Sequence, residues 1–420
     1  MVKASSLYIV LIVSFIIALI CSSLIAAAYF YRISYQQKFR YDRLQNNLQS
    51  GISLLLSERE STFPGTEKTS LFDNDIDSVI TLQQHWGVFD VGSAQAFIQQ
   101  DTLRKSFMLA KSIDSAKWSA LYLIDEDRPL SVSGQTSIRG NVRIPKAGIR
   151  AAYVNNQAYK GDPKFVDGHI YNSEKTVPAL DDKRLSQLTA QLSGNPEALP
   201  FPLNDSLIEN SFFEPVRCLK LDGLFTLKNM TLKGNIILYS DTTLFIDSTV
   251  KLSRVLIFAK SVVIGNGFKG NCQIFASDSV SAGKGAVFTY PSCIGLLPAP
   301  GRRTGLPPKV SMGEKARFDG LIFSYEKEKA PLPATIYFGK GSRITGQLYN
   351  TGTVALKDSV QINGSITCRK FLYQTDFTAY ENFLINVRIN AKALSPYYLT
   401  SDLLPVAKKR KKVLLWLEGN

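Results

Sequence analysis

The longest apolar run of the chain lies at its N-terminus. No residue from Ala4 to Tyr31 is charged, and roughly 20 apolar residues in a helix are enough to cross a bilayer. The pattern therefore predicts a transmembrane segment over residues 1–31. The residues expected to form the membrane anchor are Leu7, Ile9, Val10, Leu11, Ile12, Val13, Phe15, Ile16, Ile17, Leu19 and Ile20.

A second hydrophobic pattern follows directly. Its apolar positions recur at intervals of three and four residues, which is typical of an amphipathic helix. We expect the membrane helix to continue through residues 32–63 as far as about Glu60, where Pro64-Gly65 stops it. The positions that carry this pattern are Leu44, Leu48, Ile52, Leu55 and Leu56.

Residues 64–130 mix short strand-like and helical stretches. Trp86 to Val91 is strand-like, and the run from Thr102 to Ile113 is amphipathic. We expect a small connecting domain that is either mixed α/β or all β.

From Ser131 onward, short β-branched runs alternate with glycine. One five-residue pattern recurs six times: an apolar residue, any residue, glycine, any residue and a second apolar residue. Glycine fits the corners of a repeat structure, where positive φ or close approach of neighbouring backbones is required. The six corner glycines are Gly140, Gly234, Gly270, Gly320, Gly346 and Gly364.

The spacing of these glycines indicates a repeat of roughly 18 residues. Gly234 and Gly270 are 36 residues apart, and Gly346 and Gly364 are 18 residues apart. A single repeat cannot bury its own apolar face, so stacked coils must share one core. The fold class is therefore mainly β, with a β-solenoid over residues 215–370.

The remaining segments complete the expected organisation. Residues 131–214 hold the first strands and an insertion in which Asp181–Ser193 is compatible with a helix. The stretches Leu297–Pro308 and Glu326–Pro333 are rich in proline and read as loops that bulge from the solenoid wall. Residues 371–420 leave the period, and we expect them to form a C-terminal cap and a basic tail.

The long helix that leads into a β-rich head resembles the layout of type IV pilins and type II secretion pseudopilins. The resemblance covers about the first 60 residues, and Lys3-Ala4-Ser5 resembles a prepilin-peptidase site with Ala4 where glycine is usual. It implies a subunit that assembles with others in the cell envelope. However, Ile9 stands at the fifth mature position, where most pilins carry glutamate, which argues against processing and filament assembly. Cleavage as a signal peptide at Ala26-Ala27-Ala28 is the rival interpretation.

The repeat region resembles bactofilins and the wider right-handed β-helix class that includes pectate lyases. This resemblance covers roughly residues 215–370 and depends on the period and on the placement of glycine. It implies a rigid rod that self-associates, and it identifies no site.

The charge of the chain bears on partners and on topology. A net charge of +14 and a pI near 9.4 favour an anionic surface such as lipid headgroups, an acidic polysaccharide or nucleic acid. The dense run Lys408–Lys412 reads as a solvated tail face. The cations that follow the membrane segment would, by the positive-inside rule, keep the soluble part in the cytoplasm, against the pilin-like layout. These cations are Arg32, Lys38, Arg40 and Arg43.

Motifs for chemistry are sparse. Gly265 to Gly270 matches GxGxxG, but the residues that follow read as a strand, whereas a dinucleotide site needs a helix there. Asp241 and Asp278 occupy equivalent repeat positions and read as turn residues. His169 has no partner that suggests a triad. With two histidines and no CxxC pair, we expect no catalytic residue, no metal site and no cofactor.

The sequence thus supports a non-enzymatic, membrane-anchored structural or assembly protein of the cell envelope. The expected partners are the membrane, other envelope or scaffold proteins, further copies of the chain and an acidic polymer at the basic surface, with no specific nucleic acid. One alternative is a cytoplasmic, membrane-tethered, bactofilin-like scaffold. The other is a polysaccharide-binding or polysaccharide-degrading β-helix protein.

Overall fold

The computed structural model describes residues 3–57, 65–70, 77–194, 197–203, 205–299, 306–327, 331–375 and 378–419. The chain forms two compact units. The first comprises residues 1–84, 92–107 and 416–420, and the second comprises residues 85–91 and 108–415. Strands make up 51% of the chain, so the mainly β architecture expected from the sequence is confirmed.

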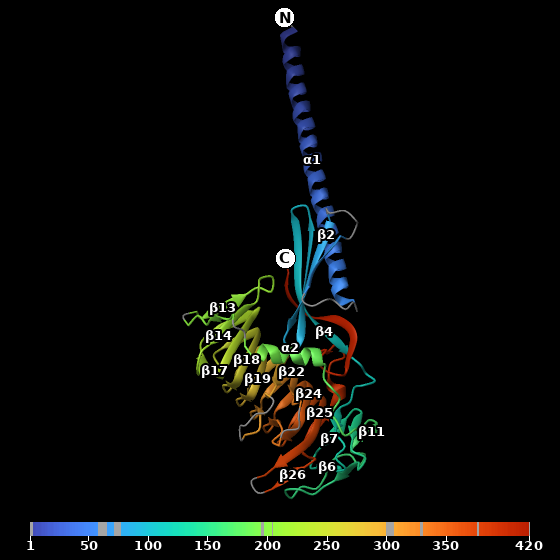
Figure 1. Cartoon of the computed structure of the whole chain (residues 1–420). Coiled ribbons are helices and arrows are strands. Elements are labelled where there is room, and N and C mark those ends of the chain that lie inside the picture. The colour runs from blue at the N-terminus through green and yellow to red at the C-terminus, as the bar shows by residue number, and fades with distance from the viewer. Residues whose placement is uncertain are drawn as a thin grey trace. The chain divides into compact units, whose positions relative to one another are not determined.

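The first unit contains helix α1 (Lys3–Leu56), which is continuous over 54 residues. Figure 1 shows it as an unbroken blue helix. At about 1.5 Å per residue its length is about 80 Å. The apolar and amphipathic patterns therefore belong to one helix, as the sequence predicted. The expected end near Glu60 lies outside the described residues.

The sheet of the first unit runs in the order β1-β2-β3-β4, with β30 paired to β4. The far ends of β2, β3, β4 and β30 belong to the second unit. The strands are β1 (Gly65–Ser70), β2 (Asp77–Trp86), β3 (Phe89–Ile98), β4 (Asp101–Ile113) and β30 (Ala407–Gly419).

The described part of residues 64–130 contains strands and no helix, which agrees with the all-β alternative and not with the mixed α/β domain. The amphipathic run from Thr102 to Ile113 is strand β4. It lies between β3 and two further partners, β29 (Leu399–Thr400) and β30. Pairing with these neighbours satisfies the backbone groups on both edges of β4, and such tertiary pairing outweighs the local helical pattern.

Within the first unit, one stripe of α1 packs on this sheet. Leu44, Leu48 and Ile52 are no more than 3% exposed. A Cβ atom at Gly51 would lie 2.4 Å from Val79 Cγ1, so glycine lets the helix approach β2 closely. The last third of α1 is consequently part of a hydrophobic core and holds a fixed place on the sheet.

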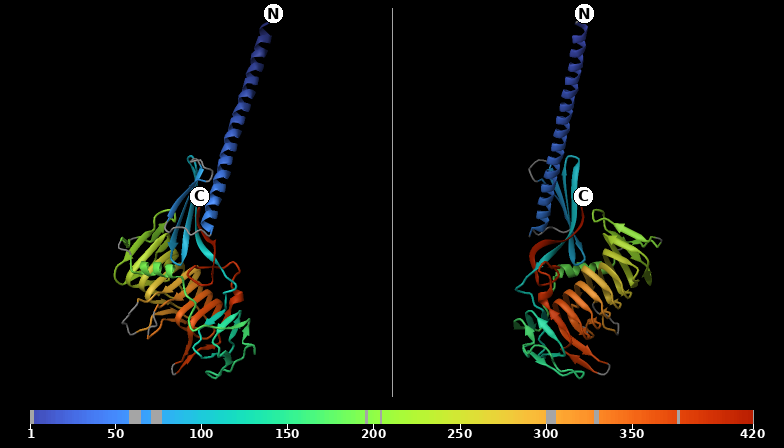
Figure 2. Two further views of the ribbon diagram at one scale, coloured as in Figure 1. Left: turned by 45° about the vertical axis from the view of Figure 1, so that its right-hand side comes forward. Right: turned by 180° about the vertical axis from the view of Figure 1, so that it is seen from behind.

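The second unit is a parallel β-solenoid, visible from behind in Figure 2 as a stack of strands. Its strands up to β16 are β5 (Leu121–Leu123), β6 (Leu130–Ser133), β7 (Ser137–Arg139), β8 (Val142–Ile144), β9 (Ile149–Ala151), β10 (Val166–Asp167), β11 (Ile170–Asn172), β12 (Leu199–Pro200), β13 (Leu207–Asn210), β14 (Arg217–Leu221), β15 (Phe225–Leu227) and β16 (Thr231–Gly234). The later elements are β17 (Ile236–Ile246), β18 (Lys251–Ile264), β19 (Lys269–Ala282), β20 (Val287–Leu296), β21 (Lys309–Met312), β22 (Arg317–Ser324), β23 (Thr335–Phe338), β24 (Arg343–Leu356), β25 (Gln361–Gln374), β26 (Ala379–Glu381), β27 (Phe383–Ile385), β28 (Arg388–Asn390) and the 3₁₀ helix η1 (Ala391–Ala393).

The pairing register gives the length of each coil. Gln347 pairs with Ser365, 18 residues later, which agrees with the period read from the glycines. Within residues 215–370, two coils are much longer: Val287 pairs with Arg317, and Arg317 pairs with Arg343. The extra residues are the stretches 297–308 and 326–333 that the sequence marked as loops, of which 300–305 and 328–330 lie outside the described residues.

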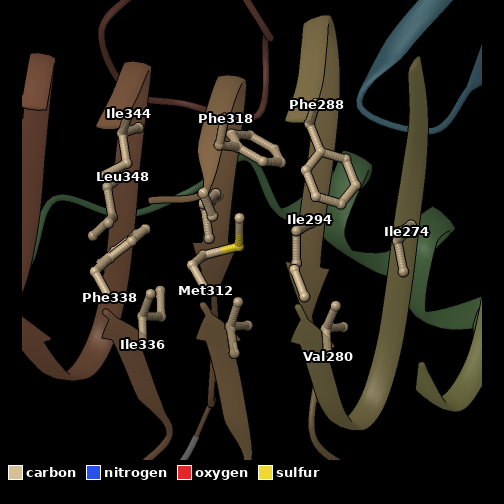
Figure 3. Packing of buried hydrophobic residues seen from close by; sticks show 14 of the residues in the cluster. Ile274, Val280, Phe288, Ile294, Met312, Phe318, Ile336, Phe338, Ile344 and Leu348 are labelled. Carbon is tan, nitrogen blue, oxygen red and sulfur yellow. The ribbon is translucent and has the colours of Figure 1, made fainter. Parts of the chain in front are cut away.

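Alternate side chains point into the solenoid and form its core. Each coil contributes three short segments separated by bends, so that Phe318, Ile322 and Ile336 reach the interior from one coil. Figure 3 shows such side chains stacked coil on coil, with Phe288 beside Phe318. The ring centroids of these two residues are 5.3 Å apart. One continuous core therefore runs through the stack.

The order of stacking differs from the order of the sequence. Strand β5 and strand β28 both pair with β25, and β8 and β7 then pair with β5 and β28. Residues 121–172 thus continue the stack beyond β25 instead of preceding β12. Figure 2 shows these teal strands at the orange-red end of the solenoid. The segment boundaries expected from the sequence remain predictions.

One outer wall of the solenoid is covered. Tyr239, Phe258 and Phe275 project outward in a stacked column, with centroid separations of 5.7 and 4.9 Å. All three are at least 94% buried. Helix α2 (Asp182–Leu192) lies against the neighbouring strands β18 and β19, where the sequence favoured a helix. The side chain of Asp181 caps it by accepting a hydrogen bond from the Arg184 backbone N–H at 2.8 Å.

The repeat glycines allow adjacent coils to bend at the same place. Gly320, Gly346 and Gly364 are directly paired on successive coils. Gly346 has φ +138°, and a Cβ atom there would lie 2.0 Å from the carbonyl oxygen of Gly320. Any side chain at Gly346 would therefore collide with the backbone of the preceding coil.

We expect Gly346→Ala to lower the free energy of unfolding by about 3 kcal/mol or more, because strained φ and a backbone clash add together. Gly267→Ala is the matched control, since Gly267 has φ +74° and nothing within 4 Å of a Cβ atom. It should lose only about 1–2 kcal/mol from backbone strain. Urea denaturation of the full chain in detergent micelles measures both values. Equal losses would contradict the steric role of Gly346.

Candidate functional site

The first candidate site is the N-terminal part of α1. Every anchor residue predicted from the sequence lies on this helix and is exposed, from Ile12 at 42% to Leu7 at 67%. The described helix is long and apolar enough to cross a membrane, and its most apolar stretch has no buried share. Because exposed large apolar surface is unfavourable in water, this segment requires a non-aqueous or protein-covered surrounding.

The second candidate is a buried ionic group in the second unit, which we call the Arg184 cluster: His85, Asp90, Arg184 and Asp402. Arg184 Nη2 lies 2.7 Å from Asp90 Oδ1 and 2.8 Å from Asp402 Oδ2, while Arg184 Nε donates to Asp402 Oδ1 at 3.0 Å. His85 Nδ1 lies 2.8 Å from Asp90 Oδ1. The side chains of Arg184 and Asp90 are only 3% and 9% exposed.

The electrostatics of the cluster favour the charged forms. Burial alone would raise the pKa of Asp90, but the hydrogen bond from His85 and the charge of Arg184 outweigh it and lower that pKa to about 2. Burial would lower the pKa of Arg184, but Asp402 and Asp90 raise it above its ordinary value. Both groups are therefore ionised at neutral pH, which is how a buried charge pair is tolerated.

Further hydrogen bonds attach the same segments to the covered wall. The Gln273 side chain accepts from the Val88 backbone N–H at 2.9 Å and donates to the Trp86 carbonyl at 3.1 Å. Ser401 Oγ donates to the Val88 carbonyl. The Arg184 cluster thus joins the β2–β3 turn, α2 and the segment at Asp402, and its arrangement is that of a structural clamp.

The structure places the six predicted corner glycines in the solenoid. Five of them have positive φ: Gly140, Gly234, Gly320, Gly346 and Gly364. Gly270 does not, although its Cβ atom would lie 3.2 Å from the Leu252 carbonyl oxygen. These residues shape the backbone, and they do not gather into a single site.

The other residues considered from the sequence are dispersed. Asp241 lies 3.1 Å from Lys220 Nζ, and His169 is exposed on the coil that contains β11. The GxGxxG stretch is followed by strand β19, not by a helix. Among the described residues, no group of three His, Cys, Asp or Glu side chains has the arrangement of a metal site.

The cysteines are not linked by disulfides. Cys272, Cys293 and Cys368 are buried, and burial raises the pKa of the Cys272 thiol to about 12. These three thiols are neutral and inaccessible, which suits core packing and not redox chemistry.

The Arg184 cluster was not foreseen from the sequence. Its members lie at positions 85, 90, 184 and 402, so no local spacing brings them together. The one available signal was Arg184 itself, a charged residue on the same face of a short amphipathic helix as Leu185 and Leu188.

Comparison with known proteins adds little to this description. No protein-family model matches the chain, and no curated protein sequence matches it. Two solved structures of an ice-binding protein (LeIBP) from an Arctic yeast are 12% and 11% identical to this chain. They cover 66% and 70% of it, and 94% and 98% of their own length, at TM-scores of 0.20 and 0.21.

A third solved structure is the competence-associated pilin ComZ from Thermus thermophilus, which is 11% identical. The match covers 86% of each chain at a TM-score of 0.26. Similarity at this level supports no inference about function. The resemblance to bactofilins stays a prediction.

We expect Arg184→Met to lower the free energy of unfolding by about 3–5 kcal/mol, because it leaves the buried Asp90 carboxylate and the partly exposed Asp402 carboxylate without their shared cation. Lys183→Met removes the same charge from the adjacent, exposed position on α2 and should change stability by less than about 0.5 kcal/mol. Urea denaturation of the full chain in detergent measures the difference. Similar losses in the two variants would show that the clamp is unimportant.

The Asp90 carboxyl should make stability fall in acid. Because its pKa is lower in the folded protein than in the unfolded chain, its contribution is complete above about pH 5 and is lost as pH falls toward 2. Between these limits the unmodified chain should lose about 2 kcal/mol more than Asp90→Asn. Asp205→Asn, at an exposed position, is the control and should keep the full acid dependence.

Proposed function

We propose that this chain is a non-enzymatic, membrane-anchored structural or assembly protein of the cell envelope, pilin-like in layout, with a β-solenoid as its head. The observation that carries the proposal is the division of α1 into two parts. From Ala4 to Tyr31 the helix carries no charge, and the anchor residues in this part are exposed, whereas its C-terminal part is packed on an antiparallel sheet.

In this proposal the N-terminal part of α1 anchors the chain, and its C-terminal part holds the folded head. The apolar stretch alone is about 40 Å long at 1.5 Å per residue, which exceeds the hydrocarbon core of a bilayer at about 30 Å. The stripe of Leu44, Leu48 and Ile52 fixes the helix to the sheet of its own unit. The same apolar surface can pack against other subunits after leaving the lipid, which is how a pilin-like chain would assemble.

The solenoid supplies a stiff extended surface. Each coil is hydrogen-bonded to two neighbours along parallel strands, so the stack resists bending. The side chains of the buried Arg184 cluster hydrogen-bond to one another. Both features suit a structural role.

A second candidate, a cytoplasmic scaffold tethered to the membrane, is favoured by the cations that follow the apolar stretch. Arg32 and Lys38 are exposed and lie just beyond it. Arg40 is engaged differently, because its Nε lies 3.7 Å from Asp101 Oδ2 within the first unit. This partner leaves the topological signal unchanged, because the positive-inside rule counts Lys and Arg and gives little weight to Asp and Glu.

We expect the full chain with a C-terminal tag to sediment with membranes in bacterial cells and to resist carbonate extraction. Ile12→Arg with Ile16→Arg should release it or prevent insertion, since a charge at the centre of a membrane helix costs about 2.5–3.5 kcal/mol per residue. Asn46→Arg with Gln49→Arg adds the same charge at exposed positions on the later part of α1 and should leave sedimentation unchanged.

Protease treatment of intact spheroplasts then decides between the two candidates. Digestion of the tag places the head outside the cytoplasm and supports the envelope function. Protection until lysis rejects that function and leaves the cytoplasmic scaffold.

A further inference from the structure

One outer face of the solenoid carries a row of unpaired cations. This face is formed by the first segment of each coil, and its register aligns one outward residue per coil. In stacking order the residues of this row are Thr231, Lys251, Lys269, Val287, Arg317, Arg343, Gln361, Arg388 and Ser137. Lys251 and Lys269 each stand two residues before the paired residues Ser253 and Asn271. The cations of this row, Lys251, Lys269, Arg317, Arg343 and Arg388, are called the basic ladder below.

All five ladder side chains are exposed. Among the described residues, none of them forms an ion pair. Other surface cations of the solenoid are paired, such as Lys233 with Glu209 and Lys284 with Glu314. The ladder is distinguished from the general basic surface by the alignment of its cations along one row that contains no acidic residue.

This arrangement costs stability in the isolated chain. Arg317 and Arg343 are directly paired on adjacent strands, and like charges directly opposite each other are destabilising. Neighbouring strands lie about 4.8 Å apart, so the row from Lys251 to Arg388 spans about 29 Å. Repulsion between cations at this spacing is relieved when an anionic partner lies along them.

A second row of polar side chains runs beside the ladder. Two residues further along the nine segments stand Lys233, Ser253, Asn271, Thr289, Asp319, Thr345, Asn363, Asn390 and Arg139. Six of these nine are hydroxyl or amide side chains, which donate and accept hydrogen bonds without charge. The face thus offers a line of cations next to a line of hydroxyl and amide groups.

The geometry points to an extended acidic polysaccharide, bound along the axis of the stack with its carboxylates on the ladder and its hydroxyls on the polar row. We propose this face as its binding site. Arg317 and Arg343 suit carboxylates because guanidinium groups bind them through two parallel hydrogen bonds.

The same observations count against nucleic acid. Single-stranded nucleic acid is held by aromatic side chains on which the bases stack, and neither row contains an aromatic residue. Duplex DNA is read by elements that enter its grooves, whereas this face is a wall of strands. A repeating carboxylate polymer needs neither feature.

The test is binding of the full chain in detergent to polygalacturonate, with fully methyl-esterified polygalacturonate as the uncharged probe. We expect salt-sensitive binding of the first and none of the second. Arg317→Gln with Arg343→Gln should lower affinity for polygalacturonate at least about tenfold. Lys260→Gln with Lys340→Gln removes the same charge from exposed positions outside the ladder and should lower affinity less than twofold.

Arg317→Lys with Arg343→Lys keeps the charge and should recover part of the lost affinity, which guards against a folding defect in the glutamine variant. Absence of polygalacturonate binding by the unmodified chain would overturn the proposal. So would equal losses in the ladder and control variants, which would indicate unspecific charge attraction. Tighter, ladder-dependent binding of duplex DNA than of polygalacturonate would replace the polysaccharide with nucleic acid.

Discussion

Each coil of the solenoid presents apolar side chains that have no partner within the same coil. Phe318 can be buried only because Phe288 lies beneath it and Ile344 above it in register. The second unit can therefore fold only if its coils stack, and its other features depend on this stacking. The glycines at the bends serve this condition, since Gly320, Gly346 and Gly364 let consecutive coils turn without separating.

The same constraint explains how the stack is extended. After β25, the next coil is assembled from β5 and β28, which are more than 260 residues apart in the sequence. The pieces meet because an open coil face would leave apolar side chains and backbone groups unsatisfied. Residues 121–172 then continue the stack. The coils are therefore not stacked in chain order. Strands from the beginning and the end of the second unit, β5 and β28, complete one coil together.

Because the interior is uniform, differences in function must come from the outer faces. One wall carries the aromatic column of Tyr239, Phe258 and Phe275 and is buried under other parts of its own unit. Another carries the basic ladder and is open to solvent. The exposed apolar stretch of α1 is a third surface. In the function and the binding proposed above, anchoring and binding therefore belong to different elements.

Local pattern was sufficient to predict several features from the sequence alone. These are the apolar helix, its amphipathic continuation, the helix near Asp181 and the solenoid period, because each depends on neighbours within one helix face or one repeat. The ladder also left a signal, since Arg317 and Arg343 both stand three residues before a repeat glycine. The strand β4 and the composite coil of β5 and β28 depended on tertiary structure. The Arg184 cluster also depended on tertiary structure. Segments distant in the sequence determine which strands pair and which buried charges form ion pairs.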